Sequence, residues 1–408
     1  MACRPAATRR PGPEPKLEEI IVETERERLF DIIRELVKWE NSNDDRTLNK
    51  ARAEIMRSCN GKPPPVYDPF CGGGSIPLEA QRLGLEAYAS DLNPVPVLIN
   101  KALIEIPPRF AGKPPVNPES RGGVAADVSR LKSSSVPKES QSRLTSAATG
   151  TWKGAAGLAE DIRYYGQWMR DEAEKRIGKL YPKVKLPKEH GGGEATVIAW
   201  LWARTVASPN PAAKGAHVPL VRSFWLSKKT DKKVWLEPVV DAATMTYRFE
   251  VRAGNGEPRA GTVKRTGREC LLTGSPIPLD YVRSEGKAGR IGARLLAVVA
   301  EGARRRVYLP PNPEHDYSAR SAEPPENLPD TDLPVEALGF RVQNYGMTKH
   351  RHLFTKRQLV ALATFSDLVA DVRGRVLLDS AGDEGYADAL ATYLAFVVDK
   401  QADLGKVR

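Results

Sequence analysis

The sequence predicts an α/β protein, and three features carry this prediction. The stretch from Pro65 to Ala80 has the order of a buried strand, a turn of three glycines and the start of a helix. The segment from Leu85 to Ser90 alternates like a second strand and is followed by an acid, Asp91. Segments near both ends of the chain carry apolar residues at helical spacing, and the middle has the period-two pattern of short strands.

Two helices are expected before the glycine turn. Residues 1–16 are rich in proline and arginine and are expected to be disordered. Apolar residues recur at helical spacing from Leu17 to Trp39, and a second helix is expected from Leu48 to Cys59. These helices and the strand–turn–helix stretch form an N-terminal part, residues 17–112, that is expected to hold a βαβ unit of a partial Rossmann-like sheet.

The glycine turn, Gly72 to Gly74, suits close contact with a ligand. Three consecutive glycines permit positive φ angles and leave no Cβ between the main chain and the ligand. Ser75 and Pro77 suit the first positions of a helix, whose N-terminus presents unpaired N–H groups. The other interpretation is an ordinary connection between a strand and a helix that binds nothing.

Two acids indicate which ligand the turn would hold. Asp68 stands before the glycines, where its negative charge disfavours phosphate and favours a cation. Asp91 is placed to accept hydrogen bonds from a ribose diol. The turn lacks both G-x-G-x-x-G and the lysine of a phosphate-binding loop. A cationic group near Asp68 and a ribose on Asp91 together describe S-adenosylmethionine, with an expected helix from Val95 to Leu103 over its adenine.

The stretches D-P-F-C-G-G-G-S (residues 68–75) and S-D-L-N-P (residues 90–94) resemble the cofactor motifs of amino-group methyltransferases. More narrowly, the chain resembles the large adenine-specific DNA methylases that carry a zinc ribbon, the DUF1156 family. The resemblance covers the front and middle of a family member, so the family is expected to extend past both ends of this chain. The matching stretches are Arg28 to Ala111, Trp152 to Val184, Ala199 to Lys229, Tyr281 to Val299 and Leu338 to Lys400.

The resemblance implies transfer of a methyl group from S-adenosylmethionine to the N6 amine of an adenine flipped out of double-stranded DNA. It implies that the two acids and the glycines hold the cofactor and that Asn93 and Pro94 shape the adenine pocket. The residues assigned to the cofactor are Asp68, Pro69, Phe70, Cys71, Gly72, Gly73, Gly74, Ser75, Asp91, Leu92, Asn93 and Pro94.

Composition agrees with a basic cytoplasmic protein. The chain has 408 residues, enough for two to three domains, and a net charge of +11. This charge favours a polyanionic partner, although an ordinary basic protein also has it. The four cysteines show no disulfide pattern, as is typical of a reducing cytoplasm. No signal segment and no apolar run of ~20 residues is found, so no membrane association is expected.

Residues 113–151 are expected to form a flexible linker. Serine, glycine, threonine and alanine dominate the part from Gly122 to Gly150. Order is expected to resume in a helical segment, residues 152–195, with a helix from Leu158 to Ile177.

Residues 196–320 are expected to form a basic, β-rich insert. Between Thr196 and Trp235, aromatic residues alternate with arginines and lysines, which combines stacking surfaces with cations for phosphates. The other interpretation is a small β subdomain whose tryptophans fill its core, and the pattern leaves both open. The candidates for contact with nucleic acid are Arg204, Arg222, Trp225, Lys228, Lys229, Arg283, Lys287 and Arg290.

The resemblance also implies a zinc ribbon in this insert, built from two knuckles that each supply two cysteines. The first knuckle falls on Ser208 to Ala213, which has no cysteine, and the second on Cys270 to Thr273, which has one. One thiolate does not hold structural zinc. A degenerate zinc-ribbon-like subdomain is therefore expected, with apolar packing in place of the ligands and no zinc.

The last part, residues 335–408, is expected to return to the methyltransferase domain. Leu338 to Lys349 has the composition of an extended segment. C-terminal helices are expected from Thr355 to Val372 and from Tyr386 to Ala402, and the second is expected to pack on the sheet.

The residues that would activate an amine are not found. The expected segment, Asp/Asn-Pro-Pro-Tyr/Phe, binds the amine and stacks on the flipped base. Three segments contain prolines with the wrong neighbours: Tyr308 to Asn312, Glu323 to Glu326 and Ser208 to Pro211. Strands three to seven of the sheet are not found either. No catalytic residue is assigned, and a second polypeptide is expected to supply the catalytic half.

Three other functions share features with this sequence. One is a catalytically incomplete nucleic-acid-binding remnant or subunit. Another is an RNA guanine-N2 methyltransferase, whose glycine motif is similar, although the stretch before the turn is too short for a THUMP-like domain. A dinucleotide oxidoreductase is disfavoured by Asp68 and by the missing G-x-G-x-x-G.

Overall fold

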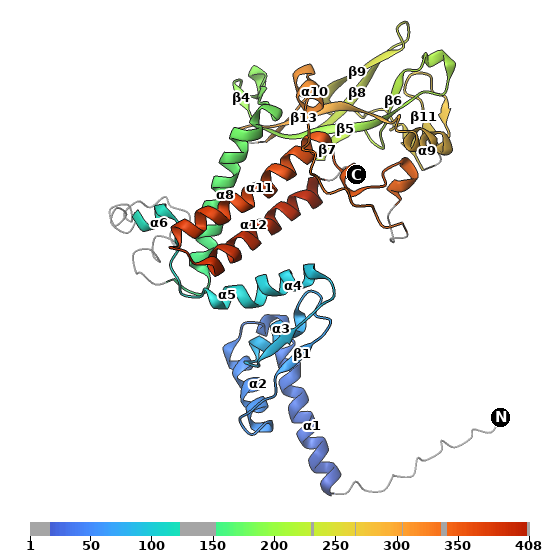
Figure 1. Ribbon diagram of the computed structural model, residues 1–408. Coiled ribbons are helices and arrows are strands. Elements are labelled where there is room, and N and C mark those ends of the chain that lie inside the picture. Colours follow the sequence, from blue (N-terminus) through green and yellow to red (C-terminus); the bar gives the residue numbers. More distant parts are fainter. Residues whose placement is uncertain are drawn as a thin grey trace, which may run out of the picture. The chain divides into compact units, whose positions relative to one another are not determined.

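The computed structural model describes residues 17–122, 152–229, 232–265, 267–303, 305–335 and 341–405. The chain divides into two compact units, Met1–Glu160 and Asp161–Arg408. Helices and small sheets make up these units (Figure 1), so the predicted mixed α/β class is confirmed. Residues 1–16 and most of the predicted linker, residues 113–151, lie outside the described residues. The first ten residues of the linker are described and include the short helix α6 (Pro118–Gly122).

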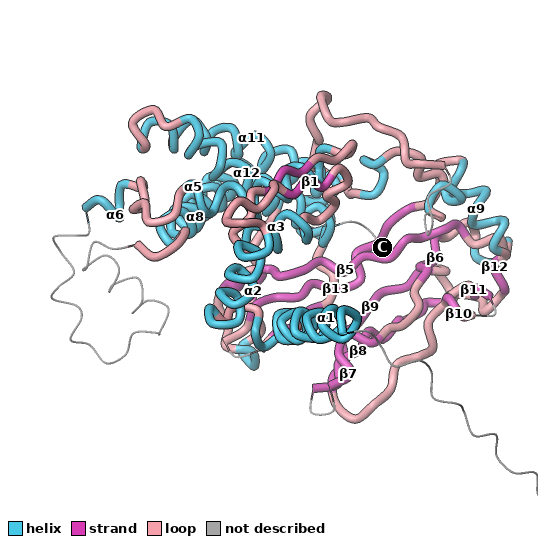
Figure 2. The backbone as a smooth tube through the Cα atoms, turned by 90° about the horizontal axis from the view of Figure 1, so that it is seen from below, coloured by secondary structure: helices cyan, strands magenta, loops and turns pink. Residues whose placement is uncertain are grey.

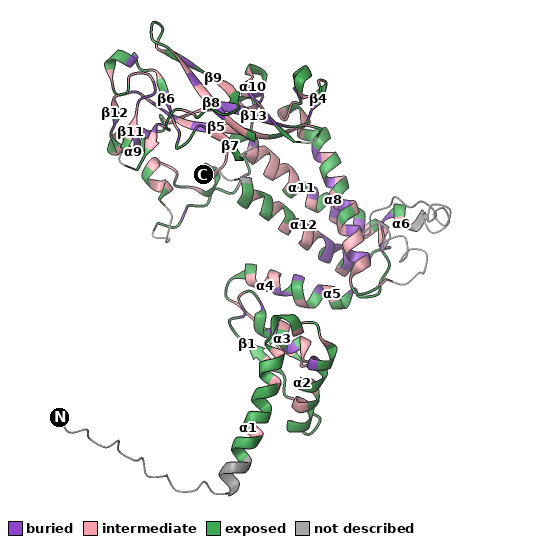
Figure 3. Cartoon of the chain, turned by 180° about the vertical axis from the view of Figure 1, so that it is seen from behind, coloured by how far each residue is buried: buried purple, intermediate pink, exposed green. Residues whose placement is uncertain are grey.

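The first unit begins with two helices, α1 (Leu17–Leu36) and α2 (Asp45–Ser58). Ion pairs join them, with Arg28 at 2.7 Å from Glu54 and Arg57 at 2.7 Å from Glu25. Exposed pairs of this kind contribute little to stability, because water and salt screen them. Most described side chains of α1 are exposed (Figure 3), so this helix adds little to the core of the unit.

A strand–helix–strand unit follows: β1 (Val66–Asp68), α3 (Ser75–Arg82) and β2 (Ala87–Ala89). The two strands are parallel, with Asp68 paired to Ala89. Among the described residues no third strand joins this two-stranded sheet, so a Rossmann-like sheet stays a prediction. The helix predicted from Val95 to Leu103 is interrupted, because α4 (Pro94–Asn100) continues into a π-helical turn, Lys101–Glu105, and then α5 (Ile106–Arg109).

Three long helices lie side by side in the second unit (Figure 1): α8 (Ala156–Ile177), which begins just before the boundary, α11 (Lys356–Asp379) and α12 (Glu384–Gly405). The Tyr165 hydroxyl of α8 donates to Asp379 of α11 at 2.6 Å. The Tyr386 hydroxyl of α12 donates to Asp161 of α8 at 2.6 Å. The sequence predicted that the last helix packs on the parallel sheet; in the structure it packs on α8 and α11.

The rest of the second unit is rich in short antiparallel strands (Figure 2). One long pairing joins β5 to β13 at the centre of a sheet with the order β14-β13-β5-β6. Smaller sheets have the orders β7-β8-β9, β10-β11-β12 and β3-β4. The strands are β3 (Val184–Lys185), β4 (Glu194–Ala195), β5 (Val197–Ala207), β6 (His217–Leu220), β7 (Trp225–Lys229), β8 (Lys232–Asp241), β9 (Thr246–Ala253), β10 (Val263–Lys264), β11 (Gly267–Glu269), β12 (Pro276–Ile277), β13 (Gly292–Glu301) and β14 (Arg306–Leu309).

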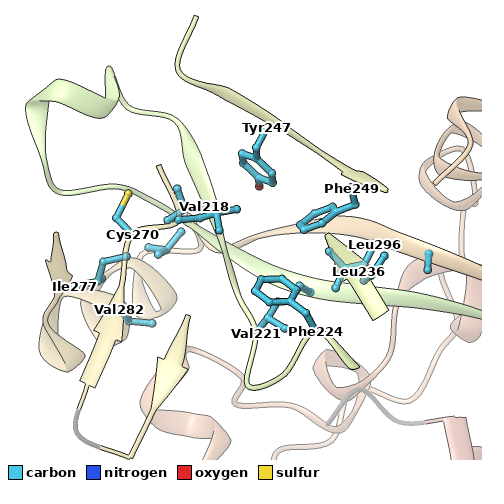
Figure 4. Packing of buried hydrophobic residues seen from close by; sticks show 14 residues of the cluster. Val218, Val221, Phe224, Leu236, Tyr247, Phe249, Cys270, Ile277, Val282 and Leu296 are labelled. Atoms are coloured by element: carbon cyan, nitrogen blue, oxygen red, sulfur yellow. The ribbon is translucent and has the colours of Figure 1, made fainter. Parts of the chain in front are cut away.

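One hydrophobic cluster ties the four-stranded sheet, the β7-β8-β9 sheet and the β10-β11-β12 sheet to each other and to α9 (Leu279–Lys287), as Figure 4 shows. Phe224 and Phe249 lie 6.1 Å apart between ring centroids, and Tyr247 meets Phe249 edge-on at 5.5 Å. The cluster fixes the ends of β5 and β6 and the start of β7, where a groove opens. A further helix, α10 (Pro313–Arg320), borders the same groove.

Candidate functional site

The two strand ends of the first unit meet at the glycine turn. Because β1 and β2 are parallel neighbours, their carboxyl ends lie at the same edge of the sheet. The Gly72 N–H donates to Oδ2 of Asp91 at 3.0 Å, and the Cys71 N–H donates to the Ser90 carbonyl at 3.0 Å. The loop after β1 is therefore bound directly to the loop after β2.

Gly74 and Gly73 differ in their surroundings. Gly74 has a φ of +85° and caps α3. A Cβ added to Gly74 would lie 2.4 Å from Oδ1 of the buried Asn100, whereas a Cβ on Gly73 would meet nothing within 4 Å. The Asn100 amide donates to the Gly72 carbonyl at 3.1 Å, and this hydrogen bond holds the turn against α4. Gly74 is thus required by the fold, and Gly73 leaves open space above the turn.

Both acids are oriented by backbone groups. Asp68 is 7% exposed, and its Oδ1 accepts from the Phe70 N–H at 3.1 Å. Asp91 is half-buried and uses one oxygen for Gly72 and the other for the Asn93 N–H at 2.9 Å. Each carboxylate oxygen has two lone pairs, so Asp91 can accept further hydrogen bonds from a ligand while it holds the turn.

Large apolar side chains stand unpacked beside the two acids. Phe70 is 81% exposed and Leu92 is 94% exposed. Asn93 caps α4 through its Oδ1, which accepts from the Val95 N–H at 3.0 Å. The predicted cofactor residues therefore occupy two adjacent loops and the starts of the helices that follow them. Phe70 and Leu92 have the exposure that contact with a flat apolar ligand requires.

Cys71, which lies inside the turn, does not have the properties of a nucleophile. Its side chain is 5% exposed and its Sγ accepts from the Asn100 amide at 3.3 Å. Burial raises the pKa of the Cys71 thiol, and the negative charges of Asp91 and Asp68 raise it further. The thiol is protonated at neutral pH, so its part in the turn is packing.

A second candidate site is a groove of about 1070 Å³ in the second unit. Its charged lining residues are all cations, and three tryptophans contribute to its walls. Arg204, Arg222 and Trp225 were predicted to contact nucleic acid, and the structure brings them together here. The groove also contains residues that were not predicted as site residues: Trp200, Trp202, Arg320, Lys356 and Arg357.

Two of the groove cations, the buried Arg357 and the half-buried Arg204, have no carboxylate partner among the described residues. Arg357 is 6% exposed; its guanidinium lies 4.1 Å from the Trp200 ring centroid and donates to the Leu180 carbonyl at 3.0 Å. Burial lowers the pKa of Arg357 and also that of Arg204, which is half-buried. Arg357 was missed because it lies on the apolar stripe of α11, eleven residues or three helical turns before the buried Leu368.

The other predicted cations lie elsewhere. Lys228 and Lys229 are exposed at the end of β7, and they do not line the groove. Arg283 pairs with Asp280 at 3.2 Å, and Arg290 pairs with Glu285 at 2.6 Å, so carboxylates already compensate both charges. Lys287 ends α9. Three of the eight predicted residues therefore share one site.

The two segments that correspond to zinc knuckles do meet. The Ser208 hydroxyl donates to Sγ of the buried Cys270 at 3.3 Å, and the Asn210 amide donates to Ser275 at 2.5 Å. Cys270 also lies in the hydrophobic cluster with Leu271 and Ile277. Apolar packing is therefore present at this place, as predicted, and hydrogen bonds between polar side chains add to it. In the described part of the chain no group of three or more His, Cys, Asp or Glu side chains is arranged to hold a metal ion.

Comparison with protein-family models, curated proteins and solved structures finds no match for this chain. None of the helices in the described ranges is long and apolar enough to cross a membrane. The assignment of both sites therefore depends on their geometry and on the motifs of the sequence.

Proposed function

We propose that this chain binds S-adenosylmethionine at the glycine turn and serves methyl transfer to a nucleic acid. The observation that supports this most is the bond between the Gly72 N–H and Asp91, which joins the loops at the carboxyl ends of two parallel strands. Open α/β sheets bind their ligands at this edge. The resemblance of the two loops to the motifs of adenine-specific DNA methylases makes double-stranded DNA the proposed acceptor.

The residues of the turn suit the proposed cofactor. Asp91 has lone pairs free to accept from ribose hydroxyls, and Asp68 attracts a cationic group. Gly73 allows the ligand to approach the main chain, since nothing else occupies the space of its Cβ. Phe70 and Leu92 would bury apolar surface against the adenine. The bound cofactor supplies an activated methyl group, and the chain's own residues bind and orient it.

The acceptor amine must be activated by groups outside the residues assigned so far. The Asp/Asn-Pro-Pro-Tyr/Phe segment is missing from the sequence. We propose that a second polypeptide supplies that step. A second candidate function is a catalytically incomplete nucleic-acid-binding subunit that holds cofactor and strand, and the cations and tryptophans of the groove favour it.

Calorimetric titration of S-adenosylmethionine into the full chain tests the proposal. We expect saturable binding that Phe70→Ala and Leu92→Ala each weaken about tenfold, because each removes apolar contact worth roughly 1.4 kcal/mol. Both side chains are exposed, so neither change should lower the unfolding midpoint. The matched control is Trp39→Ala, which removes an aromatic side chain that is 90% exposed away from the turn.

The control should bind the cofactor like the unmodified chain. Absence of saturable binding by folded protein would rule out the cofactor site. If the unmodified chain, Phe70→Ala and Leu92→Ala bind with equal affinity, the cofactor does not contact these two loops.

A further inference from the structure

The groove of the second unit carries charge that the described protein does not compensate. Arg204 and Arg357 are withdrawn from water, and neither has a carboxylate partner among the described residues. A buried cation without a counter-ion is costly, so proteins normally pair it or neutralise it with a ligand. No acidic side chain of the described segments lines the groove. These features call for an anionic ligand.

The lining also provides flat aromatic surface. Trp225 is half-buried and meets the buried Trp235 edge-on, with ring centroids 5.9 Å apart, so its ring is positioned before a ligand arrives. Trp200 is fixed by Arg357 and by a 2.7 Å hydrogen bond from its Nε1 to His315. Rigid aromatic side chains next to guanidinium groups form the usual binding surface for nucleic acid bases and phosphates.

The basic surface continues beyond the groove. A neighbouring cavity of about 400 Å³ shares Arg222, Ser223 and Trp225 with the groove and adds Arg259 and Lys264. Arg259 and Lys264 both approach Glu269, so they contribute less free charge than Arg204 and Arg222. A continuous path of this kind fits an extended chain of phosphates better than a single small anion.

The shape decides between a single strand and a duplex. Proteins read duplex DNA with a helix or β-ribbon that protrudes into a groove of the nucleic acid. Here the cations and tryptophans line a hollow, and Arg204 is half-buried within it. The backbone and bases of an unpaired strand can enter a hollow of this size, whereas a duplex would reach only its rim.

We propose that the groove binds an unpaired nucleic acid strand, with phosphates on Arg204 and Arg222 and a base stacked on Trp225. This inference deepens the proposed function by naming the form of the nucleic acid, a strand that is locally unpaired from the duplex around the flipped base. It rests on that function only in taking this nucleic acid as the methyl acceptor. Binding itself is measured without cofactor. Loss of cofactor binding with intact strand binding would therefore contradict only the proposed function, and the reverse result would contradict only this inference.

The first test measures binding of a fluorescent unpaired oligodeoxynucleotide of twelve bases to the full chain. We expect tighter binding than for the same sequence as a blunt duplex, and than for a polyglutamate of equal charge. The affinity should fall as the salt concentration rises. In a plot of log K against log salt concentration, the slope should become less steep by about 0.7 for each phosphate contact that a variant removes. Equal affinity for the duplex or for polyglutamate would overturn the inference, since the surface would then bind polyanions without regard to bases.

The second test uses matched variants. Arg204→Met should weaken strand binding at least tenfold while the unfolding midpoint stays equal or rises, because it replaces an uncompensated half-buried charge with an apolar side chain. Arg248→Met is the control: it removes an exposed arginine that pairs with Glu250 at 2.8 Å outside the groove. Unchanged strand binding by Arg204→Met would contradict the inference.

Trp225→Leu separates stacking from charge. The change keeps every cation, so we expect weaker binding of the unpaired strand and unchanged binding of polyglutamate. An equal loss of affinity for both ligands would show that Trp225 only maintains the shape of the groove, and it would contradict the proposal that a base stacks on this side chain.

Discussion

At the glycine turn, the same added methyl group should lower the stability of the first unit strongly at Gly74 and hardly at all at Gly73. In Gly74→Ala the new Cβ meets the Asn100 side chain at 2.4 Å and the backbone keeps a positive φ, so we expect the first unit to lose about 2 kcal/mol or more. Gly73→Ala places its methyl group in open space and should change the free energy of unfolding by less than about 0.5 kcal/mol.

Urea denaturation of both variants measures this difference. Gly73→Ala should still weaken S-adenosylmethionine binding, because its methyl group occupies the space assigned to the ligand. Equal stabilities for the two variants would mean that Asn100 moves aside and that the turn is not built as described.

Some site residues could be predicted from the sequence and others could not. Asp68 and Asp91 were predicted to act together, because the spacing of two parallel strand ends can be recognised from glycines and alternating residues. Arg357 could not be predicted as a groove residue. The residues next to it in the sequence do not indicate which distant side chain it contacts. Its contact with Trp200 joins residues 157 positions apart (357 − 200).

Between elements, the contact of β5 with α10 predicts a pH dependence. His315 is fully buried, and its Nδ1 accepts from Trp200 of β5. Burial lowers the pKa of His315 below its ordinary value of about 6.5. The unfolded chain therefore binds more protons than the folded one, so this contribution to stability is complete above pH 6.5 and is lost as the pH falls below it.

Thermal unfolding of the second unit between pH 7.5 and pH 5.5 measures this effect. His315→Gln should reduce the fall of the midpoint with acidification, whereas His350→Gln, which changes an exposed histidine, should keep it. A midpoint that falls equally in all three proteins would show that His315 is not the group that titrates.

The helices were predicted more reliably than their packing. Apolar spacing located α1, α2, α8, α11 and α12. Thr355, the first residue of the predicted segment, caps α11 by accepting a hydrogen bond from the Gln358 N–H. Periodicity shows which face of a helix is apolar, but not which element covers that face. The contact of α12 with α8 was not predicted, because the bond from Tyr386 to Asp161 joins residues far apart in sequence.

For the whole molecule, the main surprise is the division into two units. The sequence suggested that the last helices return to the parallel sheet, but the structure groups them with the β-rich part from Asp161 onward. Sheet pairings such as β5 with β13 join segments about ninety residues apart, and no local pattern specifies them. The two proposed sites consequently belong to different units, the cofactor turn to the first and the groove to the second.

Amide hydrogen exchange of the full chain, with and without saturating S-adenosylmethionine, tests the central claim most directly. A ligand at about 100 times its Kd stabilises the unit that binds it by roughly 2.7 kcal/mol. We predict slower exchange at Gly72 to Ser75 and at Asp91 to Val95, with the β-rich strands unchanged. Protection that is absent from both loops, or confined to the second unit, would contradict a cofactor site at the glycine turn.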